Sequence, residues 1–274
     1  MKLVNLLVAL GLAGVLSSTP ALAQREGVNV GENSLFTGLV SAEDMEATAL
    51  QQYRQVLREA AQQNALAPSS NAQLQRLRAI ANRIIPHALD WNPRAKDWKW
   101  EVNLIGSKQI NAWCMPGGKI AFYTGILNQL QLNDDEVAAV MGHEIAHALR
   151  EHARERAGKS AATNLGANVF SELLGLGSLG RTVVGGGVQL LGLSFSRDNE
   201  TQADLVGLEL AARAGYDPRA AITLWQKMNT ASKGAPPQWL STHPAGSTRI
   251  AEIERNLPRV MPLYERAKTG GTGG

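Results

Sequence analysis

Two histidines four residues apart, with a glutamate directly after the first, most constrain how this chain can fold. They lie in the segment MGHEIAHAL as His143, Glu144 and His147. On an α-helix a four-residue step leaves two side chains about 40° apart around the axis, so both imidazoles project from one face toward one point. Two histidines buried together without a partner would be costly. The segment therefore predicts a helix whose two histidines bind one metal ion.

Glu144 would lie about 100° around that helix from His143, too far to share its place on the metal. It would be well placed beside a metal-bound water, from which it could take a proton as general base. Catalytic zinc usually has three protein ligands and an open fourth position. A third ligand must therefore come from elsewhere in the chain.

In one class of such sites the motif continues to a glycine and a third histidine, which would fall at positions 150 and 153. This chain has Arg150 and Ala153 there. His152 is out of that register and lies in a charged run that ends at Arg156. We expect His152 to be a solvated histidine at a helix end, which leaves the third ligand to a carboxylate.

The segment SRDNETQAD predicts a second helix that begins after Ser196. Serine is a suitable N-cap, and Glu200 and Asp204 lie four residues apart on one face. Glu200 would complete the ligand set. Asp204, one turn further, would accept the free ring N–H of a ligand histidine, which we expect to be His143, and so fix its tautomer. The alternative is an acidic surface face without a role in the site.

Further motifs follow a fixed order along the chain. Asn111-Ala112 leads to Pro116-Gly117-Gly118, and His243-Pro244 and Arg249-Ile250 follow the two helices. With the histidine and carboxylate motifs, they make the chain resemble the zinc metallopeptidases grouped with the CAAX prenyl endopeptidases, peptidase family M48, in its soluble periplasmic branch. The resemblance covers roughly Ser41 to Pro258. Gln202 departs from it, since such proteins often carry a second glutamate there, but on a helix it faces away from Glu200.

The resemblance implies roles for residues outside the two helices. His243 would reach the active site and either stabilise the oxyanion of the tetrahedral intermediate or occupy the open metal position in a resting state. An ordinary loop histidine is the alternative. Arg249 would orient a carboxylate or anchor its helix. The strand from Ile110 to Met115, with Asn111 and Ala112, would bind extended substrate by strand addition.

These expectations describe a zinc-dependent endopeptidase with one Zn²⁺ per chain and polypeptide substrates. The rival is a zinc-stabilised periplasmic chaperone or outer-membrane assembly factor with little or no cleavage. Glu144 favours the enzyme, because a purely structural site needs no base. The formal net charge of +3 is too weak to favour a nucleic-acid partner, although peripheral contact with a membrane or with outer-membrane proteins is compatible with it.

Residues 1–23 have the layout of a secretory signal peptide. Lys2 precedes an apolar run from Leu3 to Leu16, and Ala21 and Ala23 form a small-x-small exit, so cleavage is expected before Gln24. The apolar run is shorter than the roughly 20 residues that a membrane-spanning helix needs. We therefore expect export to a bacterial periplasm as a soluble protein that acts on misfolded or unassembled envelope proteins.

Capping signals place the other helices. Ser41 and Asn71 open two helices ahead of a small sheet, Asn133 opens the helix of the histidine motif, and Asp217 with Pro218 opens another. The turn at residues 116–118 joins two strands as an antiparallel hairpin. The expected fold class is mainly α with a small antiparallel β-sheet (α+β), a zincin-like arrangement with the zinc between two helices.

The remaining segments flank this core. Residues 24–40 are expected to form an extended arm, 41–265 the metallopeptidase domain and 266–274 a flexible tail. The glycine- and leucine-rich stretch 160–196 is too interrupted for a membrane span and is expected to be a packing helix with a loop, the alternatives being a mobile flap or a membrane-contacting patch. Cys114 is the single cysteine, so no intramolecular disulfide can form, and we expect it to be a buried small hydrophobe.

Overall fold

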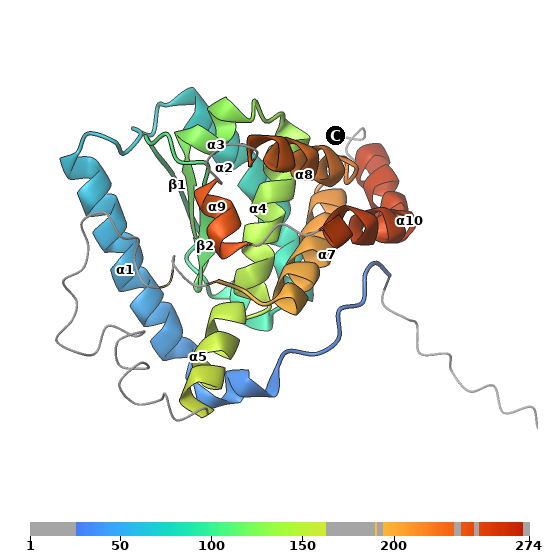
Figure 1. Ribbon diagram of the computed structural model, residues 1–274, viewed down its shortest axis with the longest axis horizontal. Coiled ribbons are helices and arrows are strands. Elements are labelled where there is room, and N and C mark those ends of the chain that lie inside the picture. The colour runs from blue at the N-terminus through green and yellow to red at the C-terminus, as the bar shows by residue number, and fades with distance from the viewer. Residues whose placement is uncertain (1–25, 163–189, 191–193, 233–236, 244–246, 271–274) are drawn as a thin grey trace, which may run out of the picture.

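The computed structural model describes residues 26–162, 190, 194–232, 237–243 and 247–270. Within these residues the fold is mainly helical, with one three-stranded sheet and a few short 3-10 helices (Figure 1). The elements in chain order are η1 (Leu35–Leu39), α1 (Ala42–Gln62), α2 (Ala72–Ile84), η2 (Ile85–Asp90), η3 (Pro93–Lys96), β1 (Glu101–Ile105), β2 (Ala112–Met115), β3 (Lys119–Tyr123), α3 (Thr124–Gln129), α4 (Asp134–Leu149), α5 (His152–Ala162), α7 (Arg197–Arg213), α8 (Ala220–Ala231), α9 (Gln238–Thr242) and α10 (Ser247–Gly270).

Four helices begin where the capping signals predict. The side chains of Ser41 and Asn71 accept the backbone N–H three residues on, as N-caps do. Asn133 and Ser196 each form a reciprocal capping box with the third helical residue, which fixes the starts of α4 and α7. Because these two helices carry the candidate ligands, their starts determine which side chains face the site.

The predicted start of α8, with Asp217 as the N-cap, is wrong by two residues, because the N-cap is Arg219. The Asp217 carboxylate accepts from the backbone and side chain of Arg219, and the Asp217 carbonyl accepts from the N–H of Ala220. These bonds form a turn, and the helix begins only after it, at Ala220.

The sheet has the strand order β1-β3-β2. β2 and β3 pair antiparallel, which confirms the predicted hairpin, and the left-handed φ angles of Gly117 (+82°) and Gly118 (+75°) form its turn. β1 pairs parallel with β3, so the sheet is mixed and the expectation of a purely antiparallel sheet is wrong. β3 is the central strand of the sheet. β2 pairs antiparallel with one of its edges, and β1 pairs parallel with the other.

α4 lies at the centre of the molecule, between the sheet and the helices α7 and α8 (Figure 1). Ile120 and Phe122 of β3 point into a core shared with α2 and α4, while Ala121 points to the opposite face, where Tyr53 of α1 packs. The sheet is therefore covered on both faces. This explains why β3 carries an almost continuous apolar run.

The backbones of α4 and α7 touch at a pair of glycines. A Cβ atom added to Gly142 would lie 2.7 Å from the carbonyl oxygen of Gly207, and one added to Gly207 would lie 2.6 Å from the backbone nitrogen of His143. No side chain fits between the helices at this point. The two glycines thus set the distance between the histidines of α4 and the carboxylates of α7.

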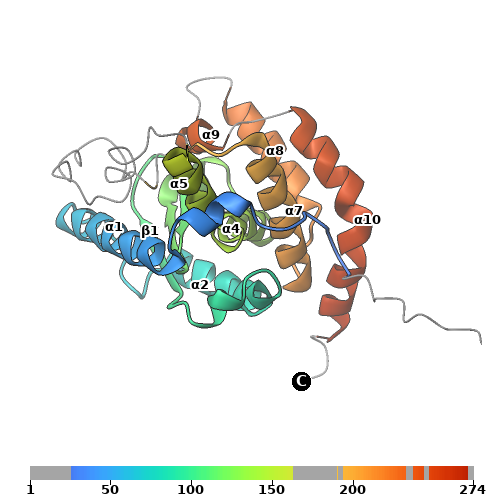
Figure 2. The same ribbon diagram turned by 90° about the horizontal axis from the view of Figure 1, so that it is seen from below.

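The segment before η1 is bound along the outside of the two site helices. Val28 N–H donates to the buried Glu209 of α7 at 2.8 Å, and Arg150 donates to the carbonyl oxygens of Gly31 and Glu32, each at 2.9 Å. Figure 2 shows this blue segment crossing in front of α4 and α7. Part of the arm expected at residues 24–40 is therefore held by the fold, and its end is the 3-10 helix η1.

Two other expectations fall partly outside the described residues. Of the glycine- and leucine-rich stretch 160–196, the structure describes α5 up to Ala162, Leu190 and residues 194–196, and the expected packing helix with its two alternatives lies outside the described residues. At the C-terminal end α10 continues to Gly270, five residues into the segment expected to be a tail. Across the described ranges, no helix combines the length and apolar character that crossing a membrane requires.

Candidate metal centre

His143 and His147 on α4 face Glu200 in the first turn of α7. The two histidine Nε2 atoms lie 3.1 Å apart, and the Glu200 carboxylate oxygens lie 3.6 Å from Nε2 of His143 and 3.5 Å from Nε2 of His147. His243 contributes a fourth nitrogen, and one ligand atom from each of the four residues lies within 4.8 Å of the others. All four side chains are buried. The three residues predicted as ligands are thus brought together, with His243 beside them.

The hydrogen bonds around this cluster leave its inner atoms free for a cation. Nδ1 of His143 lies 3.0 Å from Asp204, and since a carboxylate only accepts, His143 donates there and presents a lone pair at Nε2. Glu200 Oε1 and His243 Nε2 are buried without a hydrogen-bond partner among the residues that the structure describes. Imidazole nitrogens and one carboxylate are the donor set of catalytic zinc, so these residues fit that ion.

Asp204 and Arg249 support the cluster from behind. Arg249 donates two hydrogen bonds of 2.6 Å to Asp204 and one of 2.5 Å to Glu200, and its guanidinium lies 3.7 Å above the Trp225 ring. The position of Asp204 against His143 is the one expected from the sequence. The sequence analysis expected Arg249 either to orient one carboxylate or to anchor its helix. In the structure it binds two carboxylates, those of Asp204 and Glu200.

Arg249 affects the two carboxylates differently. Burial alone would raise the pKa of Asp204, but Arg249 and His143 hold it at about 2, so Asp204 stays ionised. Burial raises the pKa of Glu200 to about 8, against the lowering effect of Arg249. A cation beside Glu200 would favour its ionised form, as a metal ligand requires.

Glu144 projects from α4 beside the cluster and is held by a residue that the sequence reading missed. The indole Nε1 of the fully buried Trp239 donates to Glu144 Oε1 at 2.6 Å. Burial raises the pKa of Glu144 well above its usual range, and the charge of Glu200 adds to the rise. The sequence offers one hint of a role for Trp239, its position four residues before His243. That spacing does not reveal a contact with Glu144, which lies 95 positions earlier in the chain.

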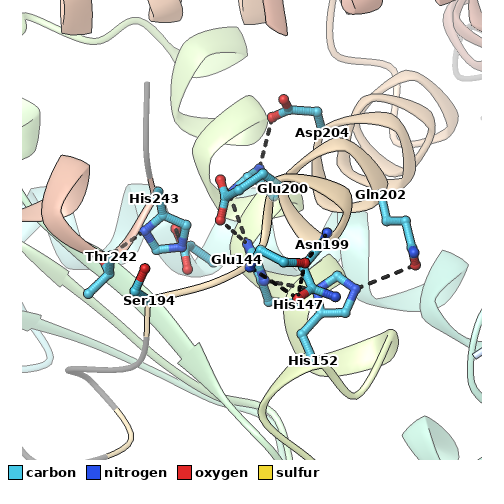
Figure 3. Close-up of polar contacts among 12 residues, drawn as sticks. Glu144, His147, His152, Ser194, Asn199, Glu200, Gln202, Asp204, Thr242 and His243 are labelled. Carbon is cyan, nitrogen blue, oxygen red and sulfur yellow. Dashed lines mark hydrogen bonds and ion pairs between the residues drawn. The ribbon is translucent and has the colours of Figure 1, made fainter. Parts of the chain in front are cut away.

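His243 lies across the site from Glu200, in the loop after α9 (Figure 3). Its ring stacks on Trp239, with centroids 5.0 Å apart, and its Nε2 is 3.7 Å from Glu144 Oε1. Nδ1 lies 2.9 Å from Thr242 Oγ1, whose hydroxyl donates to the Trp239 carbonyl oxygen, and 3.2 Å from that same oxygen; both neighbours accept, so the ring proton is at Nδ1. Burial lowers the pKa of His243 well below its usual range. The ring is therefore neutral, with a lone pair at Nε2.

The expectation that His152 is solvated is wrong. Its side chain is buried, and its Nδ1 lies 2.9 Å from Nδ1 of His147. The helix breaks at Glu151, whose φ of +55° is left-handed, so α5 starts in a new direction and His152 turns inward. Arg150, from the same charged run, is buried as well.

A cleft opens beside Glu144 and His147. Asn111 and Ala112 line it together with the rest of β2, and Phe195, Thr242 and His243 are among its other walls. Cys114 also lines the cleft and is half-buried, and burial raises the pKa of its thiol well above the usual range, which is the behaviour of an inert thiol.

Fold and site together define a zincin-like metallopeptidase domain, with two histidines on one helix and a glutamate on a second. The sequence model described as Peptidase family M48 matches residues 71–257. The chain belongs to peptidase family M48. This span holds the histidine motif, Glu200, Asp204, His243 and Arg249.

Several curated proteins are similar to this chain. The mitochondrial metalloendopeptidase OMA1 of Arabidopsis thaliana is 36% identical over 176 residues, which are 64% of this chain and 35% of that protein. OMA1 of Schizosaccharomyces pombe is 37% identical over 62% of this chain and 50% of its own length. The beta-barrel assembly-enhancing protease of Escherichia coli is 28% identical over 69% of this chain and 40% of its own length. The chain thus spans between about a third and a half of the length of these relatives.

Proposed function

We propose that this chain is a zinc-dependent endopeptidase that hydrolyses peptide bonds of exported proteins. The observation that carries the proposal is that three buried ligands converge on one point while Glu144 stands beside them at the cleft. Zinc bound there supplies Lewis acidity toward the scissile carbonyl and toward a water molecule. A purely structural site would use the same ligands but would not need Glu144.

Glu144 acts as the general base in this proposal. Trp239 holds its Oε1, which leaves Oε2 to take a proton from water and to return it to the leaving amine. The raised pKa of Glu144 suits this task, because a carboxylate that binds a proton near neutral pH is a better base than one with the usual acidic pKa. Asn111 and Ala112 would position extended substrate along the cleft.

For His243 the tautomer supports one of the two expected roles. With its proton at Nδ1, the neutral ring offers a lone pair at Nε2, as a ligand in the open metal position does. Stabilising an oxyanion would need a proton at Nε2, and the lowered pKa of His243 opposes a doubly protonated ring. We propose that, in the resting enzyme, His243 would hold the metal through Nε2 together with the other three residues of the cluster.

Zinc removal tests the proposed activity. The chain purified after zinc-replete growth is expected to contain about one zinc ion, because the described residues hold one cluster of ligand atoms, from His143, His147, Glu200 and His243. It should cleave unfolded casein, stop when a chelator strips the metal, and resume on addition of a stoichiometric amount of Zn²⁺. Elemental analysis gives the metal content, and gel electrophoresis follows cleavage. A zinc-loaded chain that leaves casein intact would favour the chaperone rival.

We further propose that residues 1–23 are a leader, that 41–265 form the peptidase domain, and that the mature protein acts in the periplasm on misfolded or unassembled envelope proteins. Support comes from the apolar run and the exit at Ala21 and Ala23. The chain recovered from a periplasmic extract is expected to begin at Gln24. An intact mass that still includes Met1 would contradict export by this route.

A further inference from the structure

The ligand histidine His147 has a second histidine behind it. Nδ1 of His147 and Nδ1 of His152 are 2.9 Å apart, so one of them carries a proton that the other accepts. Both rings are buried, with centroids 4.9 Å apart, and His152 comes from the start of a different helix, α5. Figure 3 shows His152 next to His147, on the side away from Glu144.

The contacts beyond His152 fix which ring donates. Nε2 of His152 faces Oε1 of Gln202 at 3.5 Å, and the same oxygen accepts from Arg150 Nε at 3.0 Å. Arginine has donors alone, so the Gln202 atom between these residues must be its carbonyl oxygen. Arg150 is itself held by the carbonyl oxygens of Gly31 and Glu32. The amide of Gln202 therefore cannot flip without losing the bond to Arg150.

Each bond in this series determines the next. Since Gln202 presents an oxygen, the proton of the neutral His152 ring belongs on Nε2, and its Nδ1 carries a lone pair. His147 must then donate from Nδ1, which leaves the lone pair of its Nε2 aimed at the metal position. The reverse tautomer would set the His152 lone pair against the Gln202 oxygen and would direct the His147 proton toward His143.

We propose that His152 is a positioning residue for zinc, which accepts the Nδ1 proton of His147 and so fixes that ligand in its metal-binding tautomer. Gln202 and Arg150 hold His152 in turn. This inference rests on the metal site proposed above. Within that site His152 would do for His147 what Asp204 does for His143, which is to accept the proton on Nδ1.

The two ligand histidines are thus supported by different chemistry. His143 donates to an ionised carboxylate paired with Arg249, whereas His147 donates to a neutral imidazole. The two nitrogens of the buried His152 ring face neutral groups, the His147 ring and the Gln202 amide. A neutral acceptor fixes the tautomer without adding a further charge to a buried site that already holds the carboxyl groups of Glu144, Glu200 and Asp204.

Two variants of His152 in the full chain distinguish the effect of losing the hydrogen-bond acceptor from the effect of changing the side-chain volume. In His152→Asn, the side-chain oxygen can take the place of Nδ1 and accept from His147. In His152→Leu, a similar volume remains without an acceptor. Zinc affinity is measured by competition with a chelator of known affinity, and thermal unfolding of the metal-free proteins reports on folding. The leucine variant is expected to bind zinc about 10- to 100-fold more weakly, and the asparagine variant within about 3-fold of wild type.

The role is overturned if metal-free His152→Leu is folded and binds zinc as tightly as wild type, or if the asparagine variant is as weak as the leucine variant. Should His152→Leu fail to fold, Gln202→Leu replaces it. That change touches no ligand and removes the oxygen that fixes the His152 tautomer, so affinity is expected to fall about 3- to 10-fold, and unchanged affinity overturns the proposal. A wild-type chain that binds no zinc would instead refute the metal site itself.

Discussion

Glu144→Gln is expected to lower casein cleavage at least about 100-fold while zinc stays bound. The amide keeps the shape of the side chain and can still accept from the indole of Trp239, but it takes no proton from water at neutral pH. The ligand atoms of His143, His147 and Glu200 are untouched by the change. The loss should therefore fall on kcat, with the metal content and the unfolding temperature close to those of wild type.

A matched control is Glu254→Gln, which makes the same chemical change on the exposed face of α10. It should leave cleavage unchanged. Cleavage rates, zinc content by elemental analysis and thermal unfolding are measured on all three proteins side by side. If Glu144→Gln cleaves normally, the general base is assigned wrongly, and the binding-protein rival becomes the better account of the site.

Glu200→Gln should lose zinc and activity together. A neutral amide is a poorer zinc ligand than a carboxylate, so zinc affinity is expected to fall at least about 100-fold, more than the loss typical of residues behind the ligands. Arg249 would keep its bonds to Asp204, so the metal-free fold should survive the change. Chelator competition and cleavage at a series of zinc concentrations distinguish this variant from Glu144→Gln, in which affinity is retained.

Excess zinc should restore part of the activity of Glu200→Gln but none of that of Glu144→Gln. If Glu200→Gln holds zinc as tightly as wild type, the third ligand lies elsewhere. His243 is then the next candidate, since its Nε2 lies in the same cluster. His152 is not, because its two ring nitrogens face His147 and Gln202.

The parts of the site that could be predicted depend on local spacing. His143 and His147 share a helix face because of the helical repeat, and Glu200 and Asp204 do so after a start fixed by Ser196. These four residues could therefore be grouped from the sequence, once two helices were assumed to face each other. The hairpin of β2 and β3 was predictable for the same reason, since its turn is encoded next to its strands.

The parts that could not be predicted depend on breaks in that regularity or on distant contacts. His152 was misread because the left-handed residue Glu151 redirects the chain, and nothing in a run of charged residues marks that break. Trp239 contacts Glu144, which lies 95 positions away in the chain. The parallel pairing of β1 with β3 is likewise not encoded by any pattern within either strand. Each of these contacts exists only after the helices have packed.

The contact between Gly142 and Gly207 bears on when the metal enters. Because the two backbones already touch there, the spacing of the two helices is built by protein alone and needs no ion to pull them together. We therefore expect zinc to bind to a helix pair whose spacing is already set. Under zinc starvation we expect the chain to remain folded but inactive. Added zinc would then restore its activity without synthesis of new protein.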